Sequence, residues 1–156
     1  FHINGLYAVG EGERAYALLR QLLPCADSEA ALARGQLPSF IPNYYRGAHR
    51  LYPETAGRSS QLPNSGAVAW LLRALLQGLF GLHGEREGLR FDPQLPRAWQ
   101  QARITRRIRG SVLDIEYLRH AGPLQLCVDG VLQPEPRLRG LLPGQRYRIE
   151  VRVPSP

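Results

Sequence analysis

Residues 57–81 read GRSSQLPNSGAVAWLLRALLQGLFG and contain the apolar run from which we interpret the rest of the chain. Between Ala67 and Phe80 only Arg73 and Gln77 are polar, and they lie four residues apart on one narrow stripe of a helix. A helix that is apolar on nearly every side is expected to be buried on nearly every side. The run is shorter than the about 20 apolar residues that cross a bilayer, so we expect a soluble protein larger than this chain.

The start of this helix has the composition of an anion site. Asn64 and Ser65 are good N-cap residues, and Gly66 after them is expected to leave the amides of the first turn open. A helix N-terminus with accessible N–H groups attracts anions. The alternative is an ordinary capped helix that binds nothing.

Composition limits the class of protein. The chain has 156 residues, of which 44% are hydrophobic and 21% charged, as expected for a globular domain. It begins at Phe1 and contains no Met, which indicates a piece of a longer polypeptide. The sequence shows no signal peptide and no transmembrane run, and nothing marks Cys25 and Cys127 as a pair, so we expect a reducing, cytoplasmic setting. Without a CxxC motif or a histidine cluster, neither zinc nor another cofactor is indicated.

The basic balance suggests a further class of partner. The formal net charge is +7, and all 20 basic residues are arginine. Basic proteins bind nucleic acids, but no RNA-recognition, helix-turn-helix or finger pattern is present, so nucleic acid is a disfavoured partner. We take the absence of lysine as a bias of genome composition.

Two shorter helices are predicted at the beginning of the chain. The segment 1–9 has the composition of a buried helix, and 13–23 carries its leucines on one face, so the two are expected to form a helical hairpin. His2 lies in the first of them. A lone histidine in an apolar setting is either a hydrogen-bonded core residue or a ligand-binding group, and its position alone favours the core.

A long segment without regular periodicity follows. A short helix is predicted over 28–34, and residues 35–64 then carry several prolines together with tyrosines and arginines. Loops of this length are usually functional or disordered, and the aromatic residues argue against disorder. Tyrosine rings stack on sugars or bases and arginine binds anions, so the segment is a candidate binding loop. The alternative is a packed surface loop.

The second half of the chain changes to a period of two. Apolar and polar residues alternate over 102–109, 113–117, 124–128 and 146–153, and Asp129-Gly130 predicts a hairpin turn. The pattern predicts antiparallel strands with one solvated face, on which most arginines of 103–109 would lie. We therefore expect an α+β chain with a helical domain at 1–84 and a small antiparallel β-sandwich at 85–156. No catalytic triad, P-loop or dinucleotide fingerprint is present.

Several of these segments together resemble one enzyme family. NSGAVAWLLRALLQGLFGL, GLRFDPQLPRAW and ITRRIRGSVLDIEYLR follow one another in the order found at the C-terminal end of the cellobiose-phosphorylase family, glycoside hydrolase family 94. The resemblance covers nearly the whole chain. It implies the end of an (α/α)6 barrel, followed by a C-terminal β-sandwich.

The resemblance also implies a function. Members cleave a β-glucosidic bond with inorganic phosphate and invert the anomeric centre. Their phosphate site is similar to FHIN and NSGAVAW, so His2, Ser65 and Gly66 are the expected phosphate-binding residues, although FHIN lacks one residue between Phe and His. The general acid is an Asp earlier in the barrel, so no catalytic residue is expected in this chain and the chain alone is expected to be inactive.

The acceptor is predicted from the candidate binding loop. IPNYYRGAHR and TAGRSSQL resemble the members of the family that act on cellobionic acid, whose acceptor carries a carboxylate. Arg46, Arg50 and Tyr45 are the expected substrate-binding residues. The expected partners are an oligosaccharide, phosphate as co-substrate, the rest of the same enzyme and a second copy in a homodimer. A non-catalytic module that binds carbohydrate or anions is the alternative.

Overall fold

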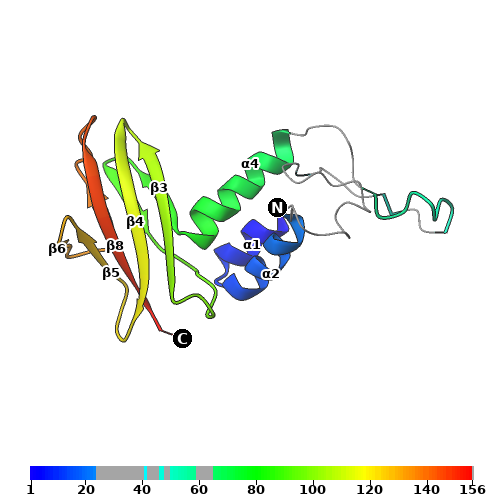
Figure 1. Ribbon diagram of the computed structural model, residues 1–156, viewed down its shortest axis with the longest axis horizontal. Coiled ribbons are helices and arrows are strands. Elements are labelled where there is room, and N and C mark those ends of the chain that lie inside the picture. Colours follow the sequence, from blue (N-terminus) through cyan, green and yellow to red (C-terminus); the bar gives the residue numbers. More distant parts are fainter. Residues whose placement is uncertain (24–40, 42–45, 48–49, 59–64, 156) are drawn as a thin grey trace.

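The computed structural model describes residues 1–23, 41, 46–47, 50–58 and 65–155. The helix predicted at 28–34 and most of the predicted binding loop, including Tyr45, lie outside these residues. Within them the protein is a mixed α+β structure, with the helices on one side and the strands on the other (Figure 1). The (α/α)6 barrel and the division into domains at residue 84 stay predictions.

The helical hairpin at the beginning of the chain is confirmed. It consists of α1 (His2–Ala8) and α2 (Gly12–Leu22), which pack together. The apolar face of α2 buries Ala15 and Leu19 completely. The helical spacing of the apolar residues therefore predicted the buried face of α2 correctly.

The apolar run forms one continuous helical segment with a change of type. It begins as α4 (Ser65–Arg73) and continues as the π-helix η1 (Ala74–Leu79), where the amide of Phe80 donates to the carbonyl of Leu75. The described residues do not bury this helix on every side, since Val68 is 44% exposed and Leu72 is 48% exposed, and its burial within a longer protein stays a prediction. Among the described elements, α1, α2 and β1 all contact η1, and α4 receives less cover.

A glycine turns the chain from helix into sheet. Gly81 has a φ of 62°, and a Cβ atom there would lie 2.1 Å from the carbonyl carbon of Asp92. The amide of Asp92 donates to the carbonyl of Gly81 at 2.9 Å. Only glycine permits this approach of two backbones, and β1 begins immediately afterwards at Leu82.

The strands form two sheets. The smaller has the order β1 (Leu82–Glu85), β2 (Gly88–Phe91) and β7 (Arg137–Arg139), and all its pairs are antiparallel. The larger has the order β3-β4-β8-β5-β6, with the bounds Gln101–Ile108, Ser111–His120, Arg146–Pro154, Gln125–Val128 and Val131–Leu132. Buried side chains from both sheets belong to one hydrophobic cluster, which also includes the helices.

The prediction of a wholly antiparallel sheet is wrong at one pair. β4 and β8 are parallel along nine residue pairs, from Val112–Arg146 to His120–Pro154. The chain between them makes β5 and β6, passes through β7 in the other sheet and returns beside β4 in the same direction. A period of two identifies a strand and its faces but carries no information on direction, so the sequence could not predict this pairing.

The predicted alternation and hairpin turn are confirmed. β4 buries Ser111, Leu113, Ile115 and Tyr117 at every second position. The turn at Asp129-Gly130 joins β5 to β6, and both residues have a positive φ, of 50° and 84°. The arginines at 103 and 107 lie on the exposed side of β3, as expected. Arg106 lies on the opposite side with Ile104, and its Nε is buried without a partner among the described residues.

Candidate functional site

The structure brings the two predicted phosphate-binding segments onto neighbouring helices. The ring of Phe1 lies 4.3 Å from that of Trp70, centroid to centroid, and Asn4 Nδ2 donates to the carbonyl of Trp70 at 3.3 Å. The beginning of α1 therefore packs beside the first half of α4. Because Phe1 and Asn4 flank His2 in sequence, these contacts anchor the segment that contains the predicted phosphate-binding histidine.

The three predicted phosphate-binding residues lie at the starts of α1 and α4. His2 is the first residue of α1 and is exposed. Ser65 and Gly66 are the first two residues of α4; the backbone of Ser65 is described, whereas its side chain is outside the described part. No acidic residue occupies the first turn of α4, so no carboxylate of that turn repels an anion near the positive end of the helix dipole. The assignment of phosphate binding to these three residues stays a prediction.

The predicted acceptor residues lie elsewhere on the surface. Arg46 and Arg50 are both exposed, and Tyr45 lies outside the described residues. Two hydrogen bonds fix the backbone of Arg46. Its amide donates to the carbonyl of Arg58 at 2.9 Å, and its carbonyl accepts from the amide of Gly57 at 2.7 Å. Among the described residues neither arginine forms an ion pair with Glu54 or with another carboxylate.

A cavity that the sequence did not predict lies where the helices meet the smaller sheet. Its volume is about 520 Å³, and its polar lining includes Asn4 from α1, Arg73 and Gln77 from the helix α4–η1, and His83, Arg90 and Asp92 from β1, β2 and the residue after it. The sequence held one signal for this cavity, since Arg73 and Gln77 were the polar stripe of the apolar run. Their contact is direct, because Arg73 Nε donates to Gln77 Oε1 at 2.8 Å.

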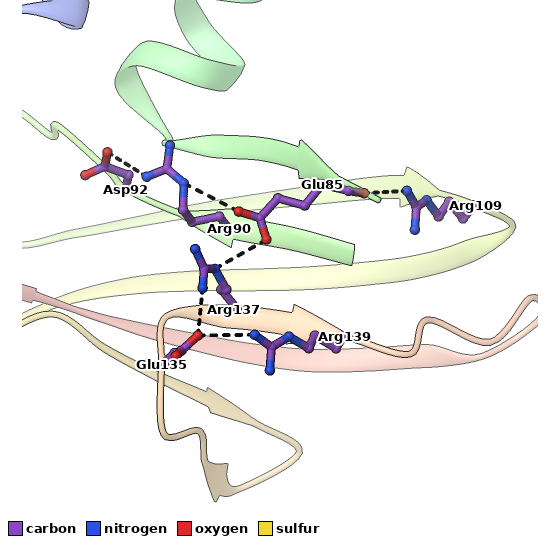
Figure 2. A network of polar contacts seen from close by, with 7 residues as sticks. All are labelled: Glu85, Arg90, Asp92, Arg109, Glu135, Arg137 and Arg139. Carbon is purple, nitrogen blue, oxygen red and sulfur yellow. Dashed lines mark hydrogen bonds and ion pairs between the residues drawn. The ribbon is translucent and has the colours of Figure 1, made fainter. Parts of the chain in front are cut away.

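Arg90 and Asp92 of the cavity belong to a ladder of charges on the smaller sheet. Figure 2 shows Glu85 between Arg90 and Arg137, with its carboxylate oxygens 3.8 and 3.3 Å from their Nε atoms. Arg90 also pairs with Asp92 at 2.9 Å, and Arg137 pairs with Glu135 at 2.8 Å. These side chains are partly exposed, so the ladder fixes orientations more than it adds stability.

Burial alters the protonation of one side chain in this cavity. The pKa of His83 lies below its ordinary value of 6.5, first because burial disfavours the charged imidazole and second because Arg90 is positive. His83 and Arg90 are direct cross-strand partners. The imidazole is therefore neutral at neutral pH and offers one donor and one acceptor.

The described part of the chain contains neither a metal-binding cluster nor a membrane-spanning helix. Within the described ranges, histidine, cysteine and acidic side chains do not form a group of three or more that could hold a metal ion. None of the helices in the described part of the chain is long and apolar enough to span a membrane.

Comparison with known proteins gives two related enzymes and no matching family model. The chain is 44% identical over 158 aligned residues to a cellobionic acid phosphorylase of Neurospora crassa. The alignment covers 99% of this chain and 20% of that protein. It is 28% identical over 147 residues to a 3-O-β-D-glucopyranosyl-β-D-glucuronide phosphorylase of Paenibacillus borealis. This alignment covers 92% of this chain and 19% of that protein.

The chain thus spans about one fifth of the length of the relatives that it matches. The two matches cover nearly all of this chain, including the helices and both sheets. The resemblance to sugar phosphorylases predicted from the ordered motifs is therefore confirmed: along almost its whole length, this chain is a relative of phosphorylases named for glucosides of sugar acids.

Proposed function

We propose that this chain is the C-terminal part of an inverting glycoside phosphorylase that converts a β-linked disaccharide and phosphate into glucose 1-phosphate and the acceptor sugar. The observation that carries the proposal is the identity of 44% over 99% of the chain to a phosphorylase. The packing of α1 against α4 supports it, because the two segments assigned to phosphate by resemblance lie on adjacent helices.

In the proposed reaction, this chain binds the phosphate. His2 and the start of α4 would bind the anion and direct one oxygen at the anomeric carbon, in line with the bond that breaks. An Asp outside this chain, as the resemblance implies, would protonate the glycosidic oxygen on the opposite face. Phosphate then takes the place that water has in an inverting glycosidase, and the configuration of the product is inverted.

The acceptor that we propose is an aldonic acid, as in cellobionic acid. The support is the name of the more similar relative and the two exposed arginines of the predicted binding loop. Arginine binds a carboxylate through two parallel hydrogen bonds, which a neutral sugar cannot accept in the same way. The second relative is named for a glucuronide, which is also a sugar acid.

The test is an assay of the full-length protein that contains this chain. It is incubated with cellobionic acid, with and without inorganic phosphate, and products are identified by chromatography. The expected result is phosphate-dependent formation of glucose 1-phosphate. Release of glucose without any sugar 1-phosphate would overturn the proposal, and binding of disaccharide with no turnover would favour the non-catalytic module.

The phosphate-binding residues are tested in the same assay. His2→Ala and Gly66→Val are expected to raise the KM for phosphate, because one removes a donor and the other places a branched side chain at the helix start. Arg97→Ala, which alters an exposed guanidinium of another loop, is the matched control. An unchanged KM for phosphate in both variants would remove the assignment of these residues.

A further inference from the structure

The lining of the cavity between α1, the helix α4–η1 and the smaller sheet includes Asn4 of the segment FHIN but none of the three predicted phosphate-binding residues, His2, Ser65 and Gly66. Arg73 and Gln77 lie 7 and 11 residues after Gly66 on the same helical segment. At 1.5 Å per residue in an α-helix, Arg73 is about 10 Å further along the axis than Gly66.

The size and lining of the cavity suit a small polar molecule. Its volume of about 520 Å³ lies within the range of about 300–1,000 Å³ that is typical of ligand sites. The polar lining residues supply amide, imidazole, guanidinium and carboxylate groups. Hydroxyl groups of a sugar-like ligand can form hydrogen bonds with groups of all these kinds.

The charges in the cavity are not balanced. Arg90 is compensated by Asp92 at 2.9 Å and by Glu85 at 3.8 Å. Arg73, in contrast, has no carboxylate partner among the described residues. Its Nε donates to Gln77, and its guanidinium lies 5.4 Å from the centre of the Trp70 ring. Both contacts orient the guanidinium and leave its two terminal nitrogens available for an anion.

The helix geometry beside Arg73 is also unusual. Gln77 and Gly78 line the cavity from the π-helix η1, and π-helical turns are rare and occur frequently at functional sites. The turn begins at Ala74, immediately after Arg73. This change of register affects which side chains of the helix lie beside the strands, and so it shapes the lining of the cavity.

We propose that this cavity binds a small polyhydroxylated anion, in which Arg73 pairs with the phosphate or carboxylate group and the amide and imidazole side chains bind the hydroxyls. The neutral state of His83 fits this assignment, because a neutral imidazole both donates and accepts a hydrogen bond. The ligand class is thus a sugar phosphate or a sugar acid bound at a second position, away from the predicted phosphate-binding helix start.

The experiment is calorimetric titration of the full-length protein with glucose 1-phosphate, gluconate and glucose. The first two probes carry the two kinds of anionic group, and glucose lacks both. Saturable binding of at least one anionic probe is expected in the His2→Ala variant, in which the predicted phosphate site is impaired. Arg73→Gln in the same background should weaken that binding by at least about tenfold, since a charged hydrogen-bonding partner is lost.

The control is Arg107→Gln, which removes an exposed arginine from the outer side of β3 and should leave binding unchanged. Circular dichroism of each variant checks that the fold is retained. Three results would overturn the proposal: no binding of either anion in the His2→Ala background, equal affinity for glucose, or equal affinity in the Arg73→Gln and Arg107→Gln variants.

Discussion

The hydroxyl of Tyr117 donates a hydrogen bond of 2.8 Å to the backbone carbonyl of Phe80. Tyr117 lies in β4 and is completely buried, and Phe80 is the C-cap residue that follows the π-helix. Their rings are 5.6 Å apart. One side chain thus joins the larger sheet to the end of the apolar helix and satisfies a carbonyl that the helix leaves without a partner.

Replacement of this hydroxyl is the first prediction. Tyr117→Phe should lower the free energy of unfolding by about 1–3 kcal/mol, because the ring is retained while the carbonyl of Phe80 is left unpaired in a buried place. Urea denaturation followed by circular dichroism measures the change. Tyr52→Phe is the control, since Tyr52 is 60% exposed, and it should change stability little. Equal effects of the two substitutions would contradict the role of this bond.

The second prediction concerns the crossing of α1 and η1. A Cβ atom on Gly78 would lie 2.2 Å from Cδ2 of Tyr7, which is 5% exposed. Gly78→Ala should therefore destabilise the protein by about 1–3 kcal/mol through overpacking, although alanine is the better helix former.

Gly5→Ala is the matched control for this crossing. Gly5 is also helical, and outside the backbone of its own helix no atom of the described residues lies within 4 Å of the position of its Cβ. The control should stabilise the protein by about 0.5–1 kcal/mol, as expected from helix propensity alone. Thermal melts of both variants provide the comparison. A stabilising effect of Gly78→Ala would show that α1 does not pack on η1 in this way.

The third prediction concerns pH. The pKa of His83 is lowered in the folded state, so on acidification the unfolded chain binds a proton on this side chain before the folded chain does. Stability contributed by neutral His83 is therefore complete above its unfolded pKa, near 6.5, and is lost as the pH falls from there towards the folded pKa. The melting temperature should fall more between about pH 8 and pH 5 in the parent than in His83→Gln. Parallel profiles would contradict the shift.

The fourth prediction addresses the proposed acceptor carboxylate. Arg46→Ala and Arg50→Ala in the full-length enzyme should lower kcat/KM for cellobionic acid. The decrease should correspond to a loss of about 2–5 kcal/mol in transition-state binding, the range for a carboxylate held away from water. The kcat/KM for cellobiose should change much less. Arg58→Ala removes a third exposed arginine of the same loop and serves as the control. An equal loss for both disaccharides would show that these arginines do not recognise the carboxylate.

The sequence by itself determined the local elements and the relation to phosphorylases. Hydrophobic spacing was sufficient for α2, the apolar helix and the faces of β3 and β4, because each depends on neighbours a few residues away. The Asp129-Gly130 turn was determined by the positive φ values that such residues accept. The order of the three motifs along the chain predicted the relation to phosphorylases, and the comparison confirmed it. Such motifs can be read from the sequence directly, because each consists of residues that follow one another in the chain.

Only the tertiary structure decided how these elements meet. The parallel pairing of β4 with β8 depends on the path of the chain through β5, β6 and β7, which no local pattern records. The partial exposure of α4 depends on which elements cover it. The cavity joins Asn4, Arg73 and Arg90 from three distant segments, and a sequence shows such a group only after folding has brought its members together. Long-range packing, and not local propensity, sets the positions of these residues.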